Sequence, residues 1–198
     1  MRPEAVQANT QSPEVKRLFE AAARHEAADD LVNARLVLNQ ILLRKDAEDV
    51  RFFIERKIGN INTVLVFGDR PMPEKTRHQI APGDLVGKLA KRYGNTQDFL
   101  LRANGIDQPN RLRIGREIWV LENPAFEMTV FKKAANAVLT LNGQFFKRYE
   151  TVAGTPPDMP AGTYAVRDGI LPRLGLRRAD AEELRILLPP GVPVTVGE

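Results

Sequence analysis

The side chains that enzymes use for covalent and metal-assisted chemistry are scarce in this sequence. There is no cysteine, and the two histidines, His25 and His78, lie far apart in the chain. Without cysteine the protein has no thiolate nucleophile, no disulfide and no cysteine-ligated metal site. A serine or threonine nucleophile would need a base and an oxyanion pocket, and the sequence shows no such constellation. We therefore expect no catalytic residues, no metal and no cofactor, and we interpret both histidines as surface residues.

Residues that begin and end short helices are frequent between positions 77 and 121. Asp84 is placed to accept backbone N–H bonds at the start of one helix, and Thr96 is placed to cap a second one. Apolar residues recur on one face of each helix, and Glu117–Leu121 forms a closing strand. The segment is therefore predicted to run strand, helix, helix, strand, with the two strands antiparallel. The turn and stop residues between these elements are Pro82, Gly83, Gly94, Asn104, Gly105 and Gly115.

The order and spacing of these residues resemble the LysM pattern, over residues 77–122. The resemblance implies a βααβ fold and binding of N-acetylglucosamine chains such as bacterial peptidoglycan or chitin. The matching positions are Pro82, Gly83 and Asp84, then 90–94, then Asn104, Gly105 and Ile106, and finally Leu112, Ile114 and Gly115.

The resemblance also implies a shallow sugar groove between the loop after the first strand and the loop after the second helix. Glycine allows a ligand close to the backbone, and amides and carbonyls at loop ends can bond an N-acetyl group. Where the family usually has threonine after the aspartate, this chain has Leu85, so one hydroxyl is missing. A competing interpretation is that these residues are helix caps only. The implied groove consists of Gly83, Asp84, Leu85 and Val86 on one side and of Asn104, Gly105, Ile106 and Asp107 on the other.

The segment before the LysM-like region has a helical pattern of apolar residues. We interpret residues 1–12 as a disordered leader, residues 13–67 as a helical cap and residues 68–76 as a linker. Ser12 is the expected N-cap of the first helix and Asp46 a candidate N-cap of the third, which ends near residue 59 or continues to Phe67. The helices loosely resemble one tetratricopeptide-type pair without a second copy. A single pair cannot bury its own face, so we expect a cap that packs on a neighbouring segment or on a second chain, rather than a peptide-binding repeat. The two candidate surfaces for a homodimer are this helical cap and the truncated C-terminal sheet.

After residue 124 the apolar period changes to two, which predicts a small mostly-β domain over residues 125–198. Phe126, Met128 and Val130 alternate, Asn142 and Gly143 predict a hairpin, and a helix and a strand follow near the end. Both ends of this region resemble an L,D-transpeptidase (YkuD-type) domain, at Gly154 and Thr155, at 160–164 and at 181–196. The family's central part, which carries a histidine and a catalytic cysteine, is missing here. We therefore interpret the region as a truncated relative without the catalytic residues.

The whole sequence predicts an α+β protein with a helical segment, a central βααβ module and a C-terminal sheet. The chain has 29 Lys and Arg against 25 Asp and Glu, with the two signs interspersed, so we do not expect nucleic-acid binding. No apolar run is long enough to span a membrane. The predicted function is non-catalytic binding of peptidoglycan or another N-acetylglucosamine polymer. The alternatives are an interaction scaffold of the cell envelope, or part of an L,D-transpeptidase whose catalytic half is absent. We expect a location in the periplasm or cell wall if an export signal was removed.

Overall fold

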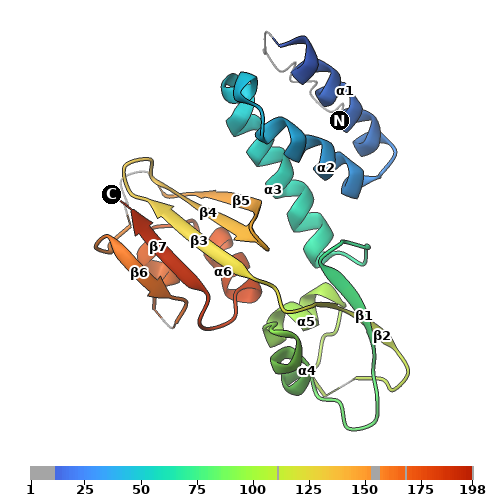
Figure 1. Cartoon of the computed structure of the whole chain (residues 1–198). Coiled ribbons are helices and arrows are strands. Elements are labelled where there is room, and N and C mark those ends of the chain that lie inside the picture. The colour runs from blue at the N-terminus through green and yellow to red at the C-terminus, as the bar shows by residue number, and fades with distance from the viewer. Residues whose placement is uncertain (1–11, 111, 153–156, 168, 198) are drawn as a thin grey trace. The chain divides into compact units, whose positions relative to one another are not determined.

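A computed structural model describes residues 12–110, 112–152, 157–167 and 169–197 of the chain. The described residues form six α-helices and seven β-strands, which confirms the α+β class (Figure 1). The chain divides into two compact units, Met1–Thr63 and Val64–Glu198. Most of the predicted leader, and the predicted Gly154 and Thr155 turn, lie outside the described residues.

The first unit is a set of helices whose ends follow from local capping. Helix α1 (Pro13–Ala27) starts at Ser12, whose hydroxyl accepts the Val15 amide at 3.3 Å, as predicted. Asp29 has a φ of 59°, which reverses the chain into α2 (Leu31–Leu42), and the Asp30 carboxylate caps that helix. The buried side chains on these two helices include Val15, Ala22, Ala34, Leu38 and Ile41.

The third helix differs from the sequence-based expectation at its start. A 3-10 helix occupies Lys45–Val50, and α3 spans Arg51–Phe67, so the helix takes the longer of the two predicted courses. Asp46 is not an N-cap. Its carboxylate instead accepts hydrogen bonds from the Ser12 hydroxyl and the Arg44 guanidinium, which together lower its pKa to about 2. Because the Asp46 carboxylate already accepts hydrogen bonds from these two side chains, it does not cap a helix, and α3 begins later, at Arg51.

The second unit starts with a two-stranded sheet and two short helices. Strand β1 (Lys75–Gln79) pairs antiparallel with β2 (Glu117–Leu121), and α4 (Val86–Tyr93) and α5 (Gln97–Ala103) lie between them in the chain. Both helices lie on the same side of the sheet in Figure 1. Gly94 ends α4 with a φ of 67°, a conformation that glycine adopts without strain. The predicted strand, helix, helix, strand order is confirmed.

The same unit contains a five-stranded sheet with the strand order β5, β4, β3, β7, β6. Strands β3 (Phe126–Phe131), β4 (Asn136–Leu141) and β5 (Gln144–Glu150) form an antiparallel meander. Asn142 and Gly143 both have positive φ, as the predicted hairpin turn requires. Strand β7 (Pro193–Gly197) pairs parallel with β3 and antiparallel with β6 (Gly162–Ala165).

Helix α6 (Arg178–Leu187) lies behind this sheet (Figure 1). The Glu183 carboxylate on α6 accepts hydrogen bonds from the Lys147 ammonium and the Tyr149 hydroxyl on β5, each at 2.8 Å. Tyr149 is 1% exposed, and burial together with the Glu183 charge raises its pKa well above the ordinary value. This contact fixes α6 to one strand of the sheet. None of the described helices is both long enough and apolar enough to cross a membrane.

Candidate functional site

The first loop of the βααβ module is held by a chain of three side chains. The ring of His78, on β1, bonds the Tyr93 hydroxyl through Nδ1 and the Asp84 carboxylate through Nε2, both at 2.9 Å. The same carboxylate accepts the Ala81 amide at 2.8 Å. The Ala81 amide holds the pKa of Asp84 below its ordinary value, and His78 acts in the same direction. The loop from 80 to 85 is thereby fixed to β1 and to the end of α4.

Two sequence-based expectations are corrected at this loop. Asp84 does not cap α4: the N-cap residue is Leu85, which has no side-chain hydrogen bond, and Asp84 turns back to the loop instead. His78 is not a surface residue, since its side chain is only 11% exposed. The spacing of residues 78, 84 and 93 did not reveal the contact, because it forms only when a turn and a helix bring three separate elements together.

Two asparagines at helix ends join the helices to strand β2 by hydrogen bonds. Asn104, after α5, donates to the Leu100 and Trp119 carbonyls and accepts the Trp119 amide at 2.6 Å. Asn95, after α4, makes the same two-way pair with the amide and carbonyl of Leu121. The side chain of Asn104 therefore forms its hydrogen bonds within the fold. Its backbone carbonyl accepts the Arg116 guanidinium.

The side chain of the single tryptophan, Trp119, contacts β1 and the turn before it. The Arg77 guanidinium lies 3.8 Å from the centre of the Trp119 ring, and the indole N–H donates to Asp69 at 2.5 Å. Lys75 donates to the carbonyls of Leu65 and Gly68, and burial lowers its pKa to about 8. These contacts position β1 and the preceding turn, and they leave the tryptophan 8% exposed.

The eight predicted groove residues differ in what they can offer to a ligand. Gly83 and Gly105 have φ values of 86° and 56°, and a Cβ added at either would meet no atom within 4 Å. Leu85 is 55% exposed, whereas Val86 and Ile106 are buried at 3% and 8%. The residues that present open backbone or side-chain surface are Gly83, Leu85, Gly105 and Asp107, and those that support the loops from inside are Asp84, Val86, Asn104 and Ile106.

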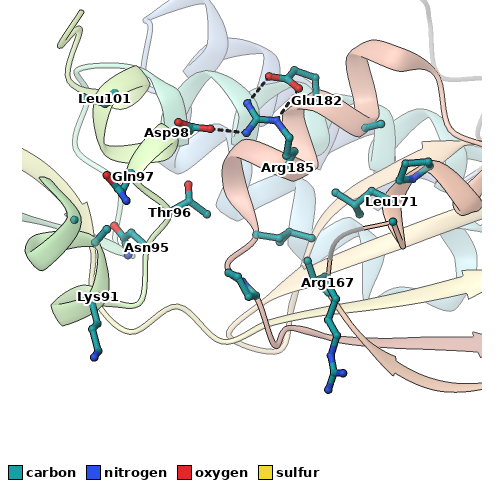
Figure 2. A pocket seen from close by; sticks show the side chains of 18 of the residues that line it. Lys91, Asn95, Thr96, Gln97, Asp98, Leu101, Arg167, Leu171, Glu182 and Arg185 are labelled. Atoms are coloured by element: carbon teal, nitrogen blue, oxygen red, sulfur yellow. Dashed lines mark hydrogen bonds and ion pairs between the residues drawn. The ribbon is translucent and has the colours of Figure 1, made fainter. Parts of the chain in front are cut away.

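A cleft of about 1280 Å³ adjoins this module (Figure 2). One wall comes from α4, α5 and the turn between them, and the opposite wall comes from α6 and the segments around Val166 and Leu171. The two walls are joined where the Thr96 hydroxyl donates to the Ile186 carbonyl and where Arg185 pairs with Asp98 at 2.5 Å. Sequence patterns did not predict this cleft, because its two walls come from segments that lie far apart in the sequence.

The described residues contain no group of three or more His, Asp or Glu side chains that could hold a metal ion. The titratable groups in the cleft are arranged as ion pairs and isolated cations. Arg185 also binds Glu182, at 2.8 Å and 2.9 Å, and Glu182 and Asp98 raise the pKa of the guanidinium further above its ordinary value. The cleft therefore offers basic side chains that a ligand with negative charge could contact.

Residues 78–121 match the family model described as the LysM domain. The match starts at His78 in β1 and ends with β2, so it coincides with the βααβ module of the structure. This segment is a LysM domain. LysM domains generally bind glycans that contain N-acetylglucosamine, such as peptidoglycan, and they are typical of extracellular and cell-envelope proteins. A comparison of the chain with curated proteins found no match.

Proposed function

We propose that the protein binds an N-acetylglucosamine-containing glycan of the bacterial cell wall, without breaking it, through the two open loops of its LysM domain. The observation that carries the proposal is the coincidence of the LysM match with two glycine loops that have free space above them. Gly83 and Gly105 let a sugar approach backbone amides and carbonyls, and Leu85 offers exposed apolar surface to its ring.

The proposal separates the residues that touch the sugar from those that hold the loops. Gly83, Leu85, Gly105 and Asp107 contact the ligand, and the backbone of the remaining groove residues completes its surface. The Asn104 side chain already makes three hydrogen bonds within the fold. Its substitution would therefore damage the domain as well as the groove.

The proposal includes the absence of catalysis and a kinship of the C-terminal sheet with L,D-transpeptidases. The chain has no cysteine, and a thiolate is the nucleophile that this kinship would require. The segments that resemble that family form β6, helix α6 and strand β7. Incubation with a disaccharide-peptide substrate should yield no cross-linked product.

The experiment that tests sugar binding is an NMR titration with N-acetylglucosamine oligomers, combined with retention on insoluble peptidoglycan. The variant is Gly83→Asn with Gly105→Asn, because asparagine tolerates positive φ and its side chain has room here. It should fold and lose binding, since the added side chains block the approach to the backbone. Gly143→Asn is the matched control: Gly143 also has a positive φ and open space, and it lies in the β4–β5 turn.

Two results would overturn the proposal. One is a wild-type protein that gives no shifts with the oligomers at millimolar concentration. The other is a folded double variant that binds as well as Gly143→Asn does.

A second candidate function is an interaction scaffold of the cell envelope. It is favoured by large apolar side chains that the helical unit leaves exposed, since Leu36, Leu43 and Phe52 are 56%, 87% and 58% exposed. Sedimentation velocity of the full chain tests its simplest form, a homodimer. Replacement of the three residues by glutamine should convert a dimer to a monomer, and a wild-type chain that is monomeric throughout would refute the homodimer.

A further inference from the structure

The described residues that line the cleft beside the LysM domain carry more positive than negative charge. Among them four are basic and two, Asp98 and Glu182, are acidic. Arg185 forms ion pairs with both acidic residues. Within the described parts of the chain, the other three basic residues, Lys91, Arg167 and Arg178, have no ion-pair partner. Figure 2 shows Lys91 and Arg167 on opposite walls of the cleft, Lys91 on α4 and Arg167 beyond β6.

The remainder of the lining is largely aliphatic. Val166, Leu171 and Leu188 are almost fully buried and form part of the cleft surface. No aromatic ring is among the described residues that line the cleft. A nucleic acid would need stacking surfaces for its bases. Aliphatic walls with isolated cations instead suit a flexible chain that carries both alkyl groups and carboxylates.

The cleft is continuous with the second loop of the proposed sugar groove. Gly105, Ile106 and Asp107 line a smaller hollow of about 390 Å³. That hollow and the cleft have Asp98, Leu101 and Arg185 in common. A branch of a polymer held at the loop can therefore pass over the Asp98–Arg185 ion pair into the cleft.

We propose that this cleft binds carboxylate-bearing side branches of the same glycan, so that the protein prefers an acidic N-acetylglucosamine polymer to a neutral one. The inference rests on the proposed function, because the LysM loops must hold the sugar backbone. Lys91 and Arg167 are the cations that receive the carboxylates. The walls cover the alkyl parts of the branch. The LysM groove itself contributes the affinity for the neutral sugar chain.

The test is isothermal titration of the full chain at low ionic strength with three ligands of equal sugar length. These are a neutral N-acetylglucosamine oligomer, a muramyl-peptide oligomer with free carboxylates, and the same oligomer with its carboxylates amidated. The free acid should bind about three- to tenfold more tightly than the amidated form, which is the scale of two exposed ion pairs. The difference should shrink as salt is added, because exposed charges are screened.

The variant is Lys91→Gln with Arg167→Gln. It should lose most of the preference for the free acid over the amidated oligomer, since only Arg178 then remains as a cation without an ion pair in the lining, and it should keep the wild-type affinity for the neutral oligomer. The matched control is Lys88→Gln with Lys133→Gln, two exposed lysines outside the cleft lining. It removes the same charge and should keep the preference for the free acid.

The possible failures are distinguishable. Equal affinity of the wild type for the acidic and amidated oligomers, with the neutral oligomer still bound, would overturn the cleft proposal alone. So would a Lys91 and Arg167 variant that keeps the preference, or single-stranded DNA that competes as well as the free acid does. Failure of all three oligomers to bind would overturn the proposed function and this inference together.

Discussion

His78 is the residue on which the geometry of the first LysM loop depends most. Its ring joins Tyr93 to Asp84, and its side chain is only 11% exposed. In His78→Phe both partners lose a hydrogen bond in a partly buried place, so the free energy of unfolding of the second unit should fall by about 1 to 2 kcal/mol. Urea unfolding followed by tryptophan fluorescence measures this loss, because the only tryptophan lies in that unit.

The control for this prediction is His25→Gln. His25 also pairs with an aspartate at 2.9 Å, but both side chains there are 37% exposed, and the pair lies in the first unit. The tryptophan-detected transition should not move. A His78→Phe protein that unfolds like the wild type would show that the ring does not support the loop.

Lys75 should make the stability of the second unit depend on alkaline pH. Burial lowers its pKa from 10.5 to about 8, and the residue is 8% exposed. Above pH 8 the unfolded chain binds more protons at this residue than the folded chain, so stability rises with pH. Between pH 8 and pH 10 the gain should reach about 2 kcal/mol. Tyr149 opposes it only weakly below pH 10, because that hydroxyl starts to titrate in the unfolded chain near pH 10 and titrates higher still in the fold.

The measurement is a series of urea unfolding curves at fixed ionic strength from pH 7 to pH 10. In Lys75→Met the rise should disappear, since methionine keeps most of the buried chain and carries no proton. A wild-type protein whose stability falls steadily from pH 8 to pH 10 would contradict the assignment.

At the residue scale, sequence patterns found the exposed glycines but not the polar contacts behind them. Gly83 and Gly105 stand out because turns and helix ends need them. The contacts of His78 depend on where the following loop and the end of α4 place Asp84 and Tyr93, and those of Asn95 depend on which backbone atoms of β2 face it. Asp84 was expected to cap a helix, since an aspartate before a helical pattern usually does so. Here the His78 ring and the Ala81 amide both bond the Asp84 carboxylate and hold it in the loop, so it does not reach the start of the helix.

Helix α4 is the element with the weakest start in the LysM domain. Its N-cap, Leu85, has extended backbone angles and no side-chain hydrogen bond, whereas Thr96 caps α5 through the Phe99 amide at 2.9 Å. Leu85→Thr should therefore stabilise the second unit by about 1 kcal/mol, because its hydroxyl can accept a backbone amide of the first turn.

Thermal unfolding of Leu85→Thr and Leu85→Val separates two effects on stability: the hydrogen bond of a capping hydroxyl and the loss of the larger leucine side chain. Valine has the shape of threonine without the hydroxyl, so it should give no gain. Equal stability of the two variants would mean that the hydroxyl finds no amide at this position.

Helix α6 depends on one buried carboxylate for its place on the sheet. Glu183 is 12% exposed and binds Lys147 and Tyr149, whereas Glu182, one residue earlier, is 51% exposed and binds Arg185. Glu183→Gln leaves the lysine charge without its partner in a mostly buried site, at a cost of about 2 to 3 kcal/mol in the free energy of unfolding. Glu182→Gln should change it little. Chemical denaturation of both variants checks the contrast, and equal effects would contradict it.

At the element scale, most strands and helices could be predicted because each has a local cause. Phe126, Met128 and Val130 alternate along β3, and Asn142 with Gly143 makes the hairpin that follows β4. The start of α3 could not be predicted, because Asp46 looked like a cap and the 3-10 helix at Lys45–Val50 intervenes. The parallel pairing of β7 with β3 joins segments far apart in the sequence, so no local pattern reveals it.

At the scale of the whole molecule, the two compact units should unfold in separate transitions. The first unit ends at Thr63 and consists of helices, and the described part of the second holds both sheets and the only tryptophan. A small unit buries a lower fraction of its surface, so the helical unit should unfold at the lower denaturant concentration. Circular dichroism at about 222 nm, which reports mainly helix, should then change before the fluorescence of Trp119 does.

Leu38→Ala tests whether the earlier transition belongs to the first unit. Leu38 is fully buried in α2, and its truncation should cost about 2 to 4 kcal/mol. The circular-dichroism transition should move to a lower denaturant concentration while the fluorescence transition stays in place. If both signals moved together, the units would unfold as one cooperative body. In that case the continuous helix α3, which spans Arg51–Phe67 and crosses the boundary at Thr63, would be the element that couples them.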